Sequence, residues 1–198
     1  ERALVVLSAA AALDPGIDLA TSDLLRARWF AGDKGAYEGA LRVKPADAGA
    51  SIHYFLLARI ALWLRDTAGA AAVKALVESS TFALREEVLG MLRLVETGAQ
   101  ADIIHRQLAL WGRASSRARR RPMFFRQLAA ETHAYLGADA AAIGAIEEAD
   151  ALGLIDLTWA DRCPIFAPLR GAPAFVAVRD RIAARAKEAL DVLEGRID

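Results

Sequence analysis

The sequence predicts an all-α protein in which antiparallel helix pairs stack into a short superhelix, an α-solenoid, with a C-terminal capping helix. Hydrophobic residues make up 55% of the 198 residues, and much of this share is alanine, the best helix former. Runs of Val, Ile and Thr that would favour strands are few. Gly-Ala pairs separate successive amphipathic stretches at a spacing close to one helix pair, which is typical of a helical array. These pairs begin at Gly35, Gly69, Gly98 and Gly137.

The predicted helices are placed by the turn and capping residues between them. Asp14-Pro15-Gly16 ends the first helix. Ser51 is a helix-start residue, and Pro122 suits the first turn of a later helix. Together with the periodicity, these signals predict about ten helices and no sheet. The helices predicted before the closing segment cover 2–13, 18–31, 36–43, 51–64, 70–77, 82–97, 102–111, 123–136 and 139–152.

The end of the chain differs from the repeats. Residues 153–173 contain Pro164, Pro168 and Pro173 and are expected to be irregular. A final helix over 173–193 follows, because apolar residues recur there at steps of three and four, which predicts one buried face and one in water. We expect a single domain, with repeat units at about 17–45, 51–79, 81–112 and 122–152 and the closing segment and capping helix at 153–198.

Two tryptophans mark the clearest internal repeat. Trp63 lies 34 residues after Trp29, and the same offset places Gly69 on Gly35. We therefore expect both indoles at the ends of first helices, six residues before a turn glycine. The aromatic residues on these apolar faces are expected in the core, and the remainder along a groove. They are Trp29, Phe30, Tyr54, Phe55, Trp63 and Trp111.

Charge and cysteine content narrow the range of functions. The 25 basic and 25 acidic residues give no net charge, whereas general nucleic-acid binding needs an excess of positive charge on one face. Cys163 is the single cysteine, which excludes an internal disulfide and makes a reducing cytoplasm the simplest setting. No apolar run reaches the ~20 residues that span a bilayer. Residues 3–13 resemble a signal-peptide core but lack a basic leader, so we favour the first helix of a piece excised from a longer protein.

The residue types that carry catalysis or bind metals share no functional spacing. His53, His105 and His133 lie far apart and do not form a ligand pattern. The adjacent carboxylates of Glu147-Glu148 diverge on a helix, whereas general acid–base catalysis needs carboxylates that converge on a substrate. We therefore expect no catalytic residue, no metal and no cofactor.

Residues 131–149 carry a recognisable arrangement of small and bulky positions. Gly137 makes the turn, Ala142 and Ala149 are small, and Ile146 is bulky. This arrangement resembles a tetratricopeptide repeat, a family in which the small residues let paired helices approach and the bulky one fills the gap. The aromatic of that family's first helix has no match here. The resemblance is therefore to a tetratricopeptide-like array, and the periodicity covers about residues 17–152.

The tail carries a second pattern: Trp, then Asp-x-x-Pro, a bulky residue, Leu-Arg, and Pro-x-Phe before a helix. It resembles the segment that closes tetratricopeptide regions in large bacterial signalling proteins, such as serine/threonine kinases, nucleotide cyclases and winged-helix regulators. No kinase, cyclase or DNA-binding signature lies within this sequence. The matching residues are Trp159, Asp161, Pro164, Phe166, Leu169, Arg170, Pro173 and Phe175.

The resemblance implies a non-catalytic protein-interaction module. It would bind a peptide or helix in a concave groove formed by the inner faces of the first helices. It would serve as the docking or sensory C-terminal region of a larger signalling protein. The family pattern places Gln127 and Glu131 on this groove. A structural or dimerisation domain without a peptide ligand is the alternative.

A basic run precedes the last repeat. Residues 113–121 hold five arginines around Ser115-Ser116. One interpretation is a solvated loop between repeats, and the other is a docking patch for an acidic partner, a phosphate or nucleic acid. The docking interpretation rests on Arg117, Arg119, Arg120 and Arg121.

Overall fold

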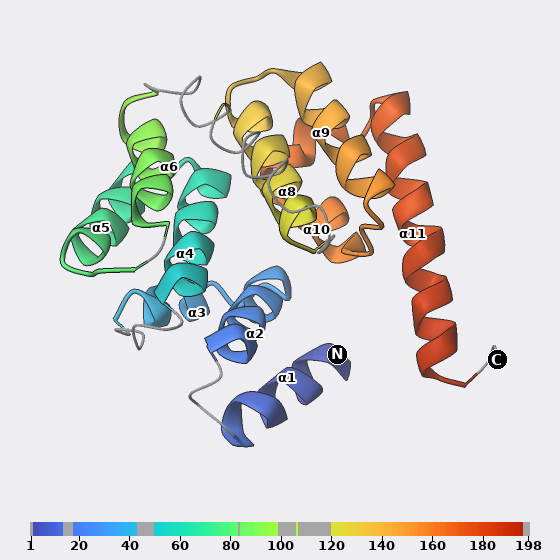
Figure 1. The fold of residues 1–198 in the computed structure, drawn as a ribbon, viewed down its shortest axis with the longest axis horizontal. Coiled ribbons are helices and arrows are strands. Elements are labelled where there is room, and N and C mark those ends of the chain that lie inside the picture. Colours follow the sequence, from blue (N-terminus) through green and yellow to red (C-terminus); the bar gives the residue numbers. More distant parts are fainter. Residues whose placement is uncertain are drawn as a thin grey trace. The chain divides into compact units, whose positions relative to one another are not determined.

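The computed structural model describes residues 2–13, 18–42, 50–82, 84–98, 106 and 120–195 (Figure 1). These residues form ten α-helices and one 3-10 helix, and none of them lies in a strand. The prediction of an all-α protein is therefore confirmed for this part of the chain. The helix predicted over 102–111 lies, apart from residue 106, outside it. The chain divides into two compact units, Glu1–Gln100 and Ala101–Asp198.

The helices of the first unit lie close to the predicted positions. Within its described residues they are α1 (Arg2–Leu13), α2 (Asp18–Phe30), α3 (Gly35–Ala40), α4 (Ala50–Leu64), α5 (Thr67–Glu78) and α6 (Arg85–Thr97). Each helix contacts its successor in the chain, and α4 also contacts α2 and α6. Neighbours in sequence are therefore neighbours in space.

Helix α4 is the centre of the first unit. Every residue from His53 to Trp63 is buried, and α2, α3, α5 and α6 all contact this helix. A helix that is apolar on almost all sides is stable only when it is enclosed. A groove was expected along the inner faces of the first helices. At α4 this face is covered by the neighbouring helices.

Two turns in the first unit share one hydrogen-bond pattern. After α2, Gly32 has φ of 102°, and the next amide, of Asp33, donates to the carbonyl five residues before it at 3.0 Å. After α4, Arg65 has φ of 53°, and the amide of Asp66 makes the same bond at 2.9 Å. A left-handed residue followed by this bond is a Schellman cap. The left-handed residues lie 33 apart. The last residues of α2 and α4 lie 34 apart, and Trp29 and Trp63 are each the next-to-last residue of their helix, as the offset of 34 predicts.

The four Gly-Ala pairs serve two different purposes. Gly98 and Gly137 have φ of 66° and 73°, and they end α6 and the helix over Arg120–Tyr135 as turn glycines. Gly35 and Gly69 instead lie in the first turns of α3 and α5, after the chain has already turned. The prediction of turn glycines is therefore confirmed for the last two pairs and wrong for the first two.

The second unit combines a helix pair with a closing segment. Its described elements are α8 (Arg120–Tyr135), α9 (Asp139–Ala151), α10 (Leu157–Arg162), the 3-10 helix η1 (Pro164–Leu169) and α11 (Pro173–Leu193). Helices α8 and α9 pack against each other. Helix α8 also contacts η1, and α11 contacts both α9 and α10.

The closing segment is helical where irregular structure was expected. The Asp156 carboxylate caps α10 by accepting the amide of Trp159 at 3.1 Å, and Pro164 occupies the first position of η1. Each of these two elements has only six residues, which is too short for a periodic pattern to be recognised. The prediction is therefore wrong for residues 157–169 apart from Cys163, which separates the two elements.

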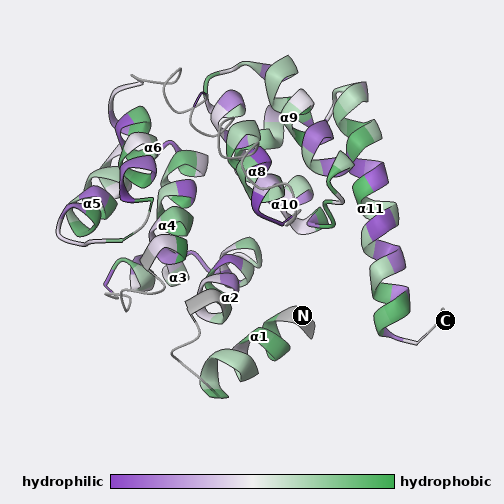
Figure 2. Cartoon of the chain, viewed as in Figure 1, coloured by the Kyte–Doolittle hydropathy of each residue, from purple (hydrophilic) through white to green (hydrophobic). Residues whose placement is uncertain are grey.

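Helix α11 buries part of its predicted apolar stripe. Phe175, Val178 and Ile182 are buried, whereas Leu190 and Leu193 are exposed. Figure 2 shows hydrophobic and hydrophilic residues alternating along α11, in contrast to the largely hydrophobic α1. The predicted face is therefore enclosed over the N-terminal half of this helix.

Candidate interaction site in the second unit

The two residues predicted to line a groove lie inside the second unit. Glu131 of α8 is fully buried, and its carboxylate accepts a hydrogen bond from Nε1 of Trp159 at 2.6 Å. Gln127 lies one turn earlier on the same face. It is also buried, with its amide nitrogen 3.5 Å from the Asp156 carboxylate. Both residues were expected to line an open groove, but the structure buries them next to α10. Their role in binding stays a prediction.

An aromatic row connects the short elements of the closing segment. The rings of Trp159 and Phe166 meet edge to face with centroids 4.9 Å apart, and those of Phe166 and Phe175 are 6.0 Å apart. All three side chains are at most 2% exposed. Helices as short as α10 and η1 are not stable alone, so this row holds them against α11.

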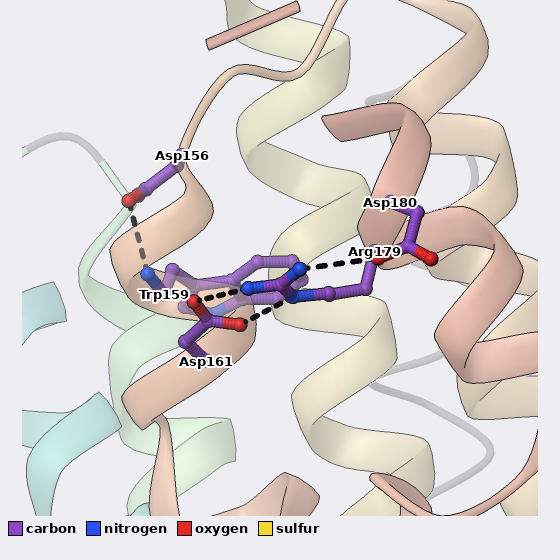
Figure 3. Close-up of polar contacts among 5 residues, drawn as sticks. All are labelled: Asp156, Trp159, Asp161, Arg179 and Asp180. Carbon is purple, nitrogen blue, oxygen red and sulfur yellow. Dashed lines mark hydrogen bonds and ion pairs between the residues drawn. The ribbon is translucent and has the colours of Figure 1, made fainter. Parts of the chain in front are cut away.

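Arg179 ties α11 to α10 (Figure 3). Its guanidinium donates to both carboxylate oxygens of Asp161, at 2.8 and 3.0 Å, and to Asp180 at 3.1 Å. The hydrogen bonds to Asp161, followed by the one to Asp180, hold the pKa of Arg179 above its ordinary value. A bidentate arginine–carboxylate pair fixes orientation as well as distance, so Asp161 sets how α11 lies on α10.

Asp150 ties α9 to α11 through two arginines. Its carboxylate accepts a hydrogen bond from Arg181 at 2.6 Å and lies 2.9 Å from the Arg185 guanidinium. Arg185 also donates to the carbonyl of Leu154 at 2.7 Å. Burial alone would raise the pKa of Asp150, but the hydrogen bonds from Arg181 and Arg185 outweigh it and lower that pKa. The carboxylate is therefore charged at neutral pH.

The remaining residues of the closing-segment pattern also have structural contacts. Leu169 is buried, and Arg170 donates to the carbonyl of Cys163 at 2.8 Å. Pro164 and Pro173 occupy early positions of η1 and α11, where the missing amide hydrogen costs nothing. In this chain the pattern therefore describes a packed structural element.

The basic run is described only in part. Arg117 and Arg119 lie outside the described residues. Arg120 and Arg121 are the first two residues of α8 and are exposed. The Arg121 guanidinium lies 5.9 Å from the ring centroid of Phe125, one turn further along. Two exposed arginines therefore lie at the N-terminus of α8, where positive charge opposes the helix dipole.

Sequence reasoning did not find the ion pairs that hold α11. Arg181 and Arg185 are four residues apart and therefore share one face of a helix. This spacing could have indicated that both contact the same acidic residue. Their partner Asp150 is 31 residues before Arg181, and no spacing rule links residues so far apart. The contact depends on how α9 and α11 pack.

The chain matches no protein-family model, no curated protein and no solved structure. Among the described helices, none is long and apolar enough to cross a membrane. Over the same residues, no three His, Cys, Asp or Glu side chains gather as a metal site would require. The buried contacts of this region hold helices together, and Arg120 and Arg121 are exposed at the start of α8.

Proposed function

We propose that this chain is a non-catalytic protein-interaction module, a tetratricopeptide-like stack of helix pairs that serves as the docking or sensory region of a larger bacterial signalling protein. The observation that carries the proposal is the repeated turn geometry of the first unit. Gly32 and Arg65 end two helices with the same hydrogen bonds, 33 residues apart. This distance is close to the ~34-residue period of tetratricopeptide repeats.

The packing order of the first unit supports a stacked array. Helix α5 contacts both α4 and α6, and α4 contacts α2 as well as α6. Each first helix therefore touches the next first helix, and the second helix of a pair packs against both. In a solenoid, each unit contacts its neighbours and the units together bury a continuous core. Such arrays bind a peptide or an amphipathic helix along one face.

Helix α11 is suited to cap the array. A terminal cap needs one apolar face toward the last repeat and one polar face toward water. The buried stripe of Phe175, Val178 and Ile182 meets the first need. Ion pairs with Asp161 and Asp150 then hold the helix in place from both sides of that stripe.

Helix α1 favours a second candidate, a structural or dimerisation domain. Val5, Val6 and Leu13 are each at least 66% exposed, and its residues 3–13 carry no charge. Exposed apolar surface of this kind marks sites of association. This candidate needs no peptide ligand.

Peptide display on the whole chain, combined with light scattering, separates the two candidates. The interaction module is expected to enrich related peptides that bind saturably, one per chain, to a monomer. A chain that enriches no peptide and is dimeric in light scattering contradicts the interaction module and supports the alternative. Substitution of Val5 and Val6 by Ser would then return that dimer to a monomer.

A further inference from the structure

Helix α1 is apolar on almost every side, but it is not enclosed. Its residues 3–13 carry no charge, and none of the side chains of residues 4–13 is buried. Figure 2 shows this helix as largely hydrophobic. In α4, by contrast, every residue over 53–63 is buried. A helix that is apolar on all sides is stable only when it is enclosed, so α1 needs a cover of the kind that α4 already has.

The exposed side of α1 lies opposite its half-buried side. Helix α1 packs on α2, and the half-buried residues Leu4, Leu7 and Ala11 share one face because they recur at steps of three and four. On the other side is the outer face of α1, in which the valines and the leucine are each at least 66% exposed. The outer face consists of Val5, Val6, Ser8, Ala9, Ala12 and Leu13.

Helix α5 shows what completes the burial of a helix in this position. Helix α5 stands before α6 in the chain as α1 stands before α2, and both pack on the helix that follows. Helix α5 also packs against α4, the first helix of its pair, and its inward residues Ala70, Val73 and Val77 are buried. The inward residues of α1 are only half-buried. A helix that lies beside α2 as α4 lies beside α6 would complete their cover.

The outward sides of the two helices differ in side-chain size. Two valines and a leucine are exposed on α1, whereas the apolar residues exposed on α5 are all alanines. Larger apolar side chains exposed together on one helix are typical of a contact surface. The exposed alanines of α5 are Ala68, Ala71, Ala72 and Ala75.

The absence of charge on α1 restricts the chemistry of its partner. Residues 3–13 offer no ion pair to an acid or a base, so the contact has to be apolar. The run of alanines over 9–12 leaves shallow space between the larger side chains, and ridges of bulky side chains on a second helix fit such grooves. An amphipathic helix with Leu, Ile or Phe at steps of three and four presents these side chains in one row.

A second copy of α1 is a poorer occupant than such a helix. Helix α1 has 12 residues and is therefore about 18 Å long. Two alanine-rich faces of this length bury little area, whereas a stable protein interface buries ~800 Å² per partner. Bulky side chains on a partner helix bury more apolar area for each residue in contact.

We propose that α1 binds an amphipathic helix of a partner protein, which packs on it in the place that a first helix takes in the array. The bulky side chains of that helix lie over Ala9 and contact Val5 and Val6. This inference rests on the proposed interaction function and adds to it the surface that is used and the kind of ligand.

Two displayed peptide libraries, applied to the full chain, test the proposal. One library has leucines fixed at steps of three and four, and the other has the same number of leucines at alternate positions in the same random background. Only the helical spacing places the leucines on one face of a helix. We expect the first library to be enriched about tenfold over the second, the ratio that a difference of ~1.4 kcal/mol in binding would give. A selected peptide is then synthesised, and its Kd is measured.

Surface variants test where the selected peptide binds. Val5→Ser combined with Val6→Ser removes exposed methyl groups and is expected to raise the Kd about tenfold. Ala9→Lys keeps a good helix former but places a charge in the apolar face, and it is expected to raise the Kd at least as much. Val176→Ser, at an exposed valine of α11, is the control and leaves the Kd unchanged. Circular dichroism shows that each variant compared is folded.

Photochemical crosslinking locates the contact directly. With Ala9→benzoylphenylalanine, irradiation is expected to join the selected peptide to α1. The same replacement at Ala71, an exposed residue on the outward side of α5, is the control and is expected to capture none.

The outcomes distinguish this inference from the proposed function. Peptides enriched without the helical spacing, or with a Kd that survives both changes in α1, overturn the α1 site and leave the interaction module intact. A chain that is dimeric in light scattering and becomes monomeric with Val5→Ser and Val6→Ser shows that a second copy covers α1, which also overturns the inference. Enrichment of no library at all overturns both the inference and the interaction module.

Discussion

At Gly69 the backbone of α5 comes unusually close to two side chains. A Cβ at this position would lie 2.2 Å from an Asp66 carboxylate oxygen and 2.8 Å from the Tyr37 hydroxyl. Asp66 caps α5 by accepting the Gly69 amide at 2.9 Å, so this carboxylate cannot withdraw without loss of the cap. Burial, followed by the charge of Asp66, raises the pKa of Tyr37 to about 12, which keeps its hydroxyl neutral. Glycine is therefore required here for space.

We predict that Gly69→Ala destabilises the first unit. The added methyl group has to displace the capping carboxylate or Tyr37, and overpacking of this kind costs ~1–3 kcal/mol. Urea unfolding followed by circular dichroism measures the free energy of unfolding. Gly39→Ala is the control, because nothing lies within 4 Å of its Cβ and alanine is expected to add ~0.5–1 kcal/mol there. Equal stability of Gly69→Ala and wild type would contradict the close approach.

At the scale of elements, α11 is held by an apolar stripe and by ion pairs on its flanks. The stripe packs through Phe175, and the flanks pair with Asp161 on α10 and Asp150 on α9. The two kinds of contact respond to different changes. Apolar packing is insensitive to pH, whereas a buried carboxylate contributes only while it is charged.

We predict that Asp150→Asn weakens α11 in a pH-dependent way. Removing the charge from this buried pair is expected to cost ~1–3 kcal/mol at neutral pH. The pKa of Asp150 is lower in the folded protein than its ordinary value, so its contribution is present above about pH 4 and is lost as the pH falls through the folded pKa. The stability difference between wild type and Asp150→Asn should therefore close under acid conditions.

Urea unfolding at several pH values measures this difference. Asp180→Asn is the matched control, because the Asp180 side chain is 63% exposed and an exposed pair contributes only ~0–1 kcal/mol. A gap between wild type and Asp150→Asn that stays constant with pH would show that the charge of Asp150 is unimportant.

We predict a large loss of stability for Phe175→Ala. Phe175 is 2% exposed and lies at the end of the aromatic row, and truncation of a buried aromatic costs ~3–5 kcal/mol. The midpoint of thermal unfolding of the protein is the quantity measured. Val176→Ala, on the exposed face of the same helix, is expected to change stability by less than ~0.5 kcal/mol. An unchanged midpoint for Phe175→Ala rules out a capping role for α11.

For the molecule as a whole, zero net charge leaves no long-range field to attract an acidic partner. Electrostatic docking therefore depends on local clusters of charge. Among the described residues, the arginines of α11 are paired with acids, and Arg120 and Arg121 are exposed at the N-terminus of α8. Positive charge at that end of a helix is unfavourable unless an anion offsets it.

We predict that reversal of Arg117, Arg119, Arg120 and Arg121 to Glu weakens binding of a partner recovered by peptide display. Attraction between exposed charges is screened by salt, so wild-type binding should also fall as ionic strength rises. Arg42→Glu, an exposed position in the first unit, controls for a change of charge alone. Equal binding by wild type and the four-residue variant at every ionic strength would leave the solvated-loop interpretation.

The pattern of amino acids along the chain was enough to predict that the described part of this protein is helical and to place most of its helices. Helix formation depends on signals that are local in the chain, such as proline and glycine stops, capping side chains and apolar residues at steps of three and four. The predicted helix over 139–152 and the final one over 173–193 lie within one residue of α9 and α11. The two six-residue helices of the closing segment were missed because so short a segment shows no period.

Which side chains meet could not be predicted without the packing of the helices. Glu131 was expected on an open groove, but it lies buried against Trp159, 28 residues further along. Asp150 meets Arg181 across 31 residues. Burial and pairing differ from the predictions because they depend on which helix faces pack together. A helix such as α4 has apolar residues on several faces, so its own sequence does not show which face packs against which neighbouring helix.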